Sequence, residues 1–282
     1  MSGVRNRLSL QRWATYPALL WTGLLFIVPL LAMLALSFAD RGTGAFTFDN
    51  YAGFVIRSDG AFAAALVNSI EVTLIVTVVS ILLAYPIAYI LAYHTPGRWQ
   101  RTLLVALILP FWTSYVIRSY SWLVVLSKNG IVNQLLLSLG AFAEPVELGN
   151  SRGATVLGFV HFFVMLLTLT TYANLVQIKE SYRKAAADLG ASSAQVFIHV
   201  TLPLSLPGIA VGAFLTFVLA IGDFITPAIL GGSKELLLPQ AIMLQVTRTA
   251  DFPFASALCM ILMLVVTAAY LMFARWLKME RV

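Results

Sequence analysis

Three ionisable side chains lie inside long apolar stretches of this sequence: Glu71, Arg118 and Asp223. A charged group within a membrane-spanning segment is costly, so such residues commonly mark ion or substrate pathways. We expect Arg118 to pair with one of the two acids, because pairing lowers the cost of burying both charges. The other acid would then attract a cation. A purely structural ion pair, with Glu71 near the interface, is the alternative.

Asp223 is the stronger candidate for contact with a cation. It lies between Gly222 and Phe224, with Thr226 and Pro227 about one turn later. Proline has no N–H, so Pro227 leaves the Asp223 carbonyl without its helical partner and available to an ammonium group. Nearby aromatic rings could hold a cation by cation–π attraction, or could form an interfacial belt: Trp112, Tyr115, Tyr120 and Trp122.

The sequence offers little for catalysis or metal binding. Cys259 is the single cysteine, and His161 has no second ligand three or four residues on, so we expect no metal site. It has neither the phosphate-binding G-x-x-x-x-G-K-[ST] loop nor the G-x-S-x-G elbow of a serine hydrolase. We therefore expect no enzymatic activity and no cofactor bound by this chain.

Composition determines which elements must position these residues. Of the 282 residues, 60% are hydrophobic and 11% are charged, whereas soluble domains carry roughly 25% charged residues. A membrane span needs about 20 apolar residues. Six segments qualify: 16–38, 66–93, 102–126, 154–178, 206–230 and 255–276.

The first of these segments is too long for the apolar core of a signal peptide. If these spans were straight helices, all three charged residues would lie in the outer half of the membrane.

The basic residues predict the orientation. If the N-terminus is cytoplasmic, the inside segments hold eleven Lys and Arg residues against three acids, and the outside segments hold six against seven. Positive charge concentrates on the cytoplasmic side of membrane proteins. We therefore predict that residues 1–15 and 277–282 are cytoplasmic, and we read the net charge of +6 as a topology signal rather than a sign of nucleic-acid binding.

The longest cytoplasmic connection, residues 179–205, has a pattern of its own. Good helix formers dominate its first half, Gly190 interrupts them, and Ser192 or Ser193 can cap a second helix. We expect two short helices that meet near Gly190, followed by Pro203 and Pro207 at the entrance of the next span. Taken alone, this is also the pattern of a simple surface linker.

The spacing within this loop carries a family resemblance. Ala185, Ala186, Gly190, Val200 and Leu202-Pro203 resemble the EAA signature of the membrane subunits of ATP-binding-cassette (ABC) importers. In that family the loop docks on a cytoplasmic ATPase. The resemblance therefore implies that the same loop of this chain, which also contains Asp188 and Leu189, docks on an ATPase. The leading glutamate of the signature is Lys184 here, so Glu180 or Asp188 would have to supply an acidic contact.

Other segments resemble the spermidine and putrescine permease subgroup, notably PFWTSYVIRSYSW in the third span and GDFITPAILGG in the fifth. The resemblance implies an all-α, six-helix type I importer permease in a bacterial inner membrane. It implies a second permease subunit, a heterodimer, together with a periplasmic solute-binding protein. ATP and Mg²⁺ would bind to a separate ATPase dimer.

Two other functions stay open at this point. An ion-gradient-driven transporter or channel would use Asp223 or Glu71 as a proton or sodium site, and the loop would then be only a linker. An ABC permease for another solute, such as an opine or an amino acid, would share every feature described above.

Overall fold

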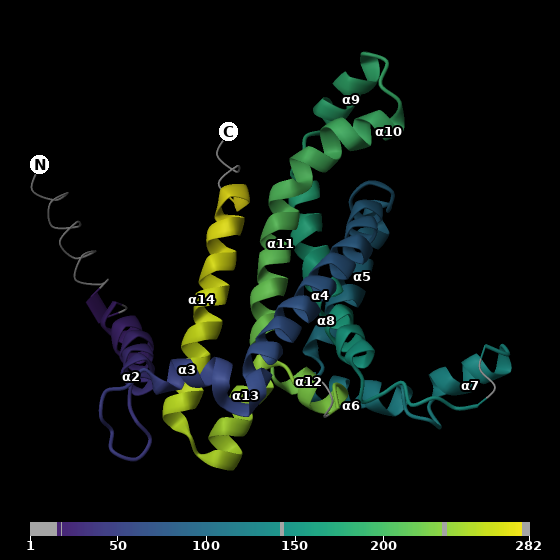
Figure 1. Ribbon diagram of the computed structural model, residues 1–282. Coiled ribbons are helices and arrows are strands. Elements are labelled where there is room, and N and C mark those ends of the chain that lie inside the picture. The colour runs from purple at the N-terminus through teal and green to yellow at the C-terminus, as the bar shows by residue number, and fades with distance from the viewer. Residues whose placement is uncertain (1–15, 18, 142–143, 233–235, 278–282) are drawn as a thin grey trace, which may run out of the picture. The chain divides into compact units, whose positions relative to one another are not determined.

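The computed structural model describes residues 16–17, 19–141, 144–232 and 236–277, which form helices joined by turns and loops (Figure 1). The chain divides into two compact units. Unit 1 comprises Met1–Ala63 and Ile242–Met263, and unit 2 comprises Ala64–Ala241 and Leu264–Val282. The first turn of α4 and the first half of α14 belong to unit 1. Each unit is described by itself.

Unit 2 holds the predicted sites. Its helices are most of α4 (Ala61–Tyr93), α5 (Gly97–Ile108), the 3-10 turn η3 (Leu109–Trp112), α6 (Tyr115–Val125), α7 (Ile131–Ser138), α8 (Arg152–Leu175), α9 (Glu180–Asp188), α10 (Ser193–Val196), the π-helical turn η4 (Phe197–Thr201), α11 (Leu202–Gly222), α12 (Ile225–Leu230), the start of α13 (Leu238–Leu244) and the end of α14 (Phe252–Leu277).

The core of unit 2 is built on the packing of α8 against α11. Gly208 and Gly212 of α11 lie so close to α8 that an added Cβ would overlap Asn174 and Thr170, so glycine permits the close approach that membrane helices favour. Buried side chains from α4 and α8 fill the space beside this pair, with Val76, Phe159 and Phe163 each at most 2% exposed.

Within the described residues, five helices are long and apolar enough to span a membrane, and one bent pair raises the number to six. The five are Leu19–Ser37, Asp49–Tyr93, Arg152–Leu175, Ser193–Gly222 and Phe252–Ala274, and the bent pair is Gly97–Trp112 with Tyr115–Val125. The all-α class and the six apolar segments therefore agree with the sequence prediction, although two of the segments are not straight.

The third segment bends by 91° between Trp112 and Tyr115. Thr113 and Ser114 have extended backbone there, and the hydroxyl of Thr113 donates to the carbonyl of Pro110 at 2.7 Å. The fifth segment stops at Gly222, because Asp223 has extended backbone (φ −83°, ψ 126°), and α12 begins anew at Ile225. A depth counted along a straight span therefore does not hold for Arg118, which follows the bend, whereas Asp223 directly follows the last residue of a continuous helix.

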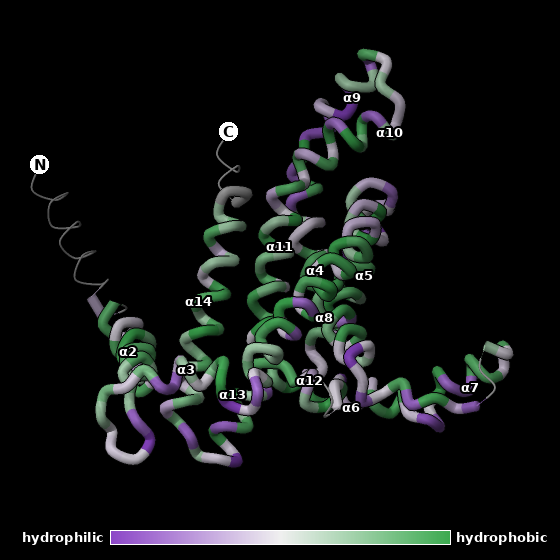
Figure 2. Tube along the Cα trace, in the orientation of Figure 1, coloured by the Kyte–Doolittle hydropathy of each residue, from purple (hydrophilic) through white to green (hydrophobic). Residues whose placement is uncertain are grey.

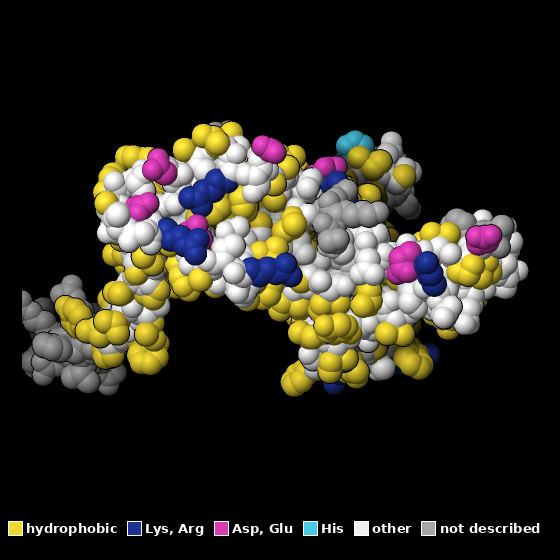
Figure 3. All heavy atoms as spheres, turned by 60° about the horizontal axis from the view of Figure 1, so that its bottom comes forward, with side chains coloured by type: hydrophobic (Ala, Val, Ile, Leu, Met, Phe, Trp, Pro, Cys, Tyr) yellow, Lys and Arg dark blue, Asp and Glu magenta, His cyan; other side chains and the backbone are white. Residues whose placement is uncertain are grey.

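The two ends of unit 2 carry different elements. The α9–α10 turn lies beyond one end of α8 and α11, whereas α6, α7 and α12 lie at the other end (Figure 1). The long helices are mostly hydrophobic, and the α9–α10 region is more hydrophilic (Figure 2). Charged side chains of both signs are exposed on the face that holds the α6–α7 end (Figure 3). Helix α7 lies in the connection between α6 and α8.

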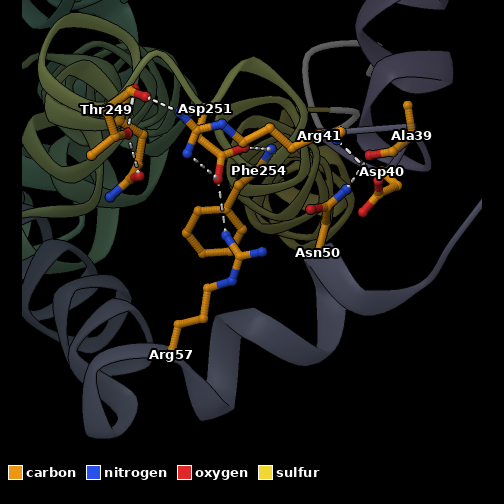
Figure 4. A network of polar contacts seen from close by, with 10 residues as sticks. Ala39, Asp40, Arg41, Asn50, Arg57, Thr249, Asp251 and Phe254 are labelled. Atoms are coloured by element: carbon orange, nitrogen blue, oxygen red, sulfur yellow. Dashed lines mark hydrogen bonds and ion pairs between the residues drawn. The ribbon is translucent and has the colours of Figure 1, made fainter. Parts of the chain in front are cut away.

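Unit 1 contains the π-helical turn η1 (Gly23–Ile27), α2 (Val28–Ser37), α3 (Asp49–Ile56), the 3-10 turn η2 (Arg57–Gly60) and the π-helical turn η5 (Gln245–Thr249). Asp251, 5% exposed, connects these elements (Figure 4). It accepts from Arg57 at 3.1 Å, lies 3.9 Å from Arg41, and caps α14 by accepting from the Phe254 amide at 3.1 Å. In the adjoining loop, hydrogen bonds from Thr43 and Gly42 hold the pKa of Asp40 below its ordinary value.

Candidate functional site

Asp223 lies at the break between α11 and α12, where its carboxylate collects several donors. Oδ1 accepts from the Ile225 amide at 2.8 Å, and Oδ2 accepts from the Thr226 amide at 3.4 Å and from the Tyr115 hydroxyl. Backbone amides at a helix start favour the charged form of a carboxylate. The carboxylate is therefore held in place by donors from two helices, and it remains partly exposed.

Tyr115, the first residue of α6, connects that helix to α12. Its hydroxyl contacts Thr226 as well as Asp223, so three residues that the sequence analysis singled out come together here. The ring of Phe162, from α8, packs edge-on against Tyr115 with the centroids 5.3 Å apart. A cation that approached Asp223 would therefore meet a carboxylate fixed by the hydroxyl of an aromatic residue.

Arg118 does not form the ion pair that we predicted. Among the described residues it has no carboxylate partner, and its Nε and Nη1 atoms are buried without a hydrogen bond. Its guanidinium lies over the ring of Phe162, 4.9 Å from the centroid, and 5.6 Å from that of Tyr115. The prediction failed because the turn between α5 and α6 directs α6 away from the axis of a straight span.

Glu71 also has a different partner from the one predicted. Its carboxylate lies 2.8 Å from Arg152, at the start of α8, and its side chain is 55% exposed. The pair joins α4 to α8 and is separate from the Asp223 cluster. Glu71 therefore has a structural contact and an exposed position, as in the alternative interpretation that placed it near the interface.

The remaining aromatic candidates are placed differently from one another. Trp112 is 88% exposed and Tyr120 is 55% exposed. Trp122 donates through Nε1 to Nδ1 of His161 at 3.0 Å, so His161 accepts a hydrogen bond from a neighbouring side chain. In the described part of the chain, no three His, Cys, Asp or Glu residues are grouped to hold a metal ion.

The loop after α8 forms the two short helices that we predicted, α9 and α10. Gly190 lies between them in the left-handed region (φ +88°), which non-glycine residues seldom adopt. Ser192 and Gln195 form a reciprocal capping box at the start of α10. Helix α10 then continues through η4 into α11 without a break. Val200 lies in η4, and Leu202 and Pro203 lie in the first turn of α11. The helix that is long enough to span the membrane therefore begins earlier than predicted.

The signature residues of this loop are largely exposed. Lys184 lies 3.2 Å from Glu180, one turn earlier, and both side chains are at least 70% exposed. Ala185 and Asp188 are exposed, Ala186 is half-buried, and Leu189 at the tip is 90% exposed. The chain thus neutralises Lys184 with its own acid while leaving a small, apolar tip uncovered.

Sequence reasoning missed the contacts that hold this loop to the bundle. Arg183 lies over the ring of Tyr93 at 4.0 Å, and the Tyr93 hydroxyl donates to the carbonyl of Leu175 at 2.9 Å. Tyr93 therefore links the ends of α4 and α8 to α9. The one available signal was the run Tyr85, Tyr89, Tyr93, which repeats every four residues on one face of a helix.

Comparison with known proteins identifies the family. Residues 7–278 match the model of a family described as "Binding-protein-dependent transport system inner membrane component". The chain belongs to this family. It is therefore an inner-membrane permease component of an ABC importer that works with a solute-binding protein and an ATPase, and it is not an enzyme, as the sequence predicted.

Relatives within the family are similar over most of their length. The spermidine/putrescine transport system permease protein PotB is 33% identical in Salmonella typhimurium (strain SL1344), over 90% of this chain and 89% of the relative, and 32% identical in Escherichia coli (strain K12), over 90% and 93%. The inner membrane ABC transporter permease protein YdcU of Escherichia coli (strain K12) is 30% identical, over 91% and 86%.

Solved structures confirm the permease fold. A chain of a bacterial ABC transporter involved in the import of the acidic polysaccharide alginate superposes with a TM-score of 0.78, covering 98% of each chain at 18% identity. A chain of an amino acid ABC transporter superposes with a TM-score of 0.53, at 12% identity, over 83% of this permease and 97% of that chain. At these identities the likeness concerns the fold alone.

Proposed function

We propose that this permease forms half of the translocation path for a polyamine or a related organic cation, with a second permease subunit as the other half. The carboxylate of Asp223 carries the proposal, because it lies at a break in a spanning helix, accepts from two backbone amides, and accepts from the hydroxyl of Tyr115. The spermidine/putrescine permeases among the relatives support the same class of solute.

We also propose that the α9–α10 loop is the docking site for the cytoplasmic ATPase. Its tip combines the exposed Leu189 with the small residues Ala185 and Gly190, which let another backbone approach closely. ATP binding would draw the ATPase subunits together, and the loop would pass that movement to α8 and α11. Hydrolysis would then reset the permease.

Uptake of labelled spermidine and putrescine by the reconstituted importer tests the solute proposal. Asp223→Asn keeps the shape of the side chain and removes its charge, so we expect uptake of these cations to fall at least tenfold while uptake of a neutral solute, where one is carried, changes far less. Glu71→Gln is the matched control, because Glu71 is paired with Arg152, and it should change uptake less than threefold. Equal loss for charged and neutral solutes would contradict charge recognition by Asp223.

Two further measurements separate this function from the alternatives. Transport that continues without ATP, together with failure of a co-expressed ATPase to co-purify, would favour an ion-gradient-driven transporter. Uptake of an amino acid or an opine in place of polyamines would keep the ABC mechanism and change the solute.

A further inference from the structure

A hollow of about 310 Å³ opens beside Arg118, and Asp223 is not among the residues that line it. It is lined by Arg118, His161, Ser121 and Thr113, and by apolar side chains that include Ile117 and Val125. None of the lining residues is acidic. The hollow therefore presents one fixed positive charge inside walls that are otherwise apolar.

The arginine in this hollow lacks the partner that its burial demands. Arg118 is 9% exposed, and its Nε and Nη1 atoms have no hydrogen-bond partner among the described residues. The rings of Phe162 and Tyr115 contact the guanidinium, but a ring offers no acceptor oxygen. A buried charge without a counter-charge is strongly unfavourable in proteins, so we expect an acceptor from beyond the described residues to face this guanidinium.

No other polar group that lines the hollow accepts a hydrogen bond from Nε or Nη1 of Arg118. The hydroxyls of Ser121 and Thr113 donate to backbone carbonyls, and Nδ1 of His161 accepts from Trp122. In a neutral His161 the proton is then on Nε2, which makes the ring a second donor. The hollow is thus suited to an anion.

We propose that this hollow binds a carboxylate side chain from a transmembrane helix of the second permease subunit. Charge complementarity supports a carboxylate, and the apolar rim, where Ile117 is 65% exposed, fits a helix face better than it fits a hydrated free anion. The polycationic solute of the proposed function cannot fill the site, because the guanidinium repels it. The inference rests on the proposed pairing with a second permease subunit.

Co-purification of the two permease subunits tests the site in the complete importer. Arg118→Gln removes the charge, and we expect the amount of second subunit retained in detergent to fall at least tenfold, whereas Arg118→Lys should retain most of it. Arg152→Gln is the matched control, because Arg152 has an acid within its own chain. Its loss should leave the pairing of the subunits unchanged. Binding of the ATPase to the α9–α10 loop, measured separately, should persist in every variant.

A charge exchange keeps the test decisive if Arg118→Gln fails to insert. In an R118E chain, each acidic residue in the spans of the second subunit is changed to arginine in turn, and one such change should restore pairing and uptake. Rescue by none of them would overturn the proposal. Normal pairing of Arg118→Gln would also overturn the proposal. Loss of a bound phospholipid, detected by mass spectrometry, would then indicate a lipid site, and selective loss of uptake of solutes that carry a carboxylate would indicate a solute site. Normal pairing without polyamine uptake by the wild-type importer would instead contradict the proposed function.

Discussion

At the scale of single residues, the arrangement around Asp223 separates two tasks. The backbone amides of Ile225 and Thr226 hold the carboxylate in place, whereas the Tyr115 hydroxyl reaches it from another helix. The first contacts are local and form whenever α12 starts. The second depends on the position of α6, so it can change when the helices move during transport.

Tyr115→Phe removes this second contact, together with the contact to Thr226, and leaves the two amide contacts in place. A hydrogen bond contributes about 1 kcal/mol net, and more when one partner is charged, so we expect the KM for spermidine uptake to rise roughly 5- to 30-fold with little change in the amount of inserted protein. Tyr120→Phe, an exposed tyrosine of the same helix, is the control and should leave KM unchanged. A KM for Tyr115→Phe equal to that of wild type would show that the hydroxyl does not orient Asp223.

How much of this site the sequence could predict depended on the residue. Asp223 and Tyr115 stood out as a charged and an aromatic group in apolar spans, and Thr226 was named for its position one turn after Asp223. The structure brings the three together. The partner of Glu71 was not predictable, since Arg152 follows a different span and its approach depends on packing. The unpaired state of Arg118 was hidden for the same reason.

At the scale of elements, the breaks in the spans matter more than the spans. Hydropathy located all six apolar segments, because it depends on composition alone. It could not locate the bend at Thr113–Ser114 or the end of α11 at Gly222, because extended backbone there is stabilised by particular hydrogen bonds, such as Ile225 N–H to Asp223. These breaks create the polar site, so the part of the fold most relevant to function was the part least visible in the sequence.

Gly190 provides a test at this scale, because only its backbone conformation is at stake. With φ +88° and open space where a Cβ would lie, Gly190→Ala would strain the turn between α9 and α10 without any clash. Left-handed backbone costs an L-residue about 1–2 kcal/mol, so we expect uptake and the ATPase activity stimulated by solute-binding protein to fall several-fold, while insertion stays normal.

The matched control for this change is Gly140→Ala, at the end of α7. Gly140 has φ +68° and open space around it, so it suffers comparable strain at the other end of unit 2, away from the loop. Gly140→Ala should leave stimulated ATPase activity intact. Equal effects of the two changes on that activity would indicate general destabilisation rather than a role of the α9–α10 loop in coupling.

At the scale of the whole molecule, charge and the arrangement of unit 2 predict one topology. Lys179, Arg183 and Lys184 lie in α9 or at its start, and Arg98 lies in the first turn of α5, whereas Glu144 and Glu147 follow α7 at the opposite end of unit 2. Because basic residues concentrate on the cytoplasmic side, we expect the α9–α10 turn and both chain termini to face the cytoplasm.

The single cysteine makes this topology measurable. In a Cys259→Ser background, a cysteine placed at the exposed Ala187 of α9 should react with a membrane-impermeant maleimide in inside-out vesicles but not in intact spheroplasts. A cysteine at the exposed Ser138 of α7 should show the reverse, because a single crossing, α8, separates α7 from α9 along the chain. Labelling of Ala187→Cys from outside would place the proposed ATPase-docking loop on the side that lacks ATP, and the coupling mechanism could not operate.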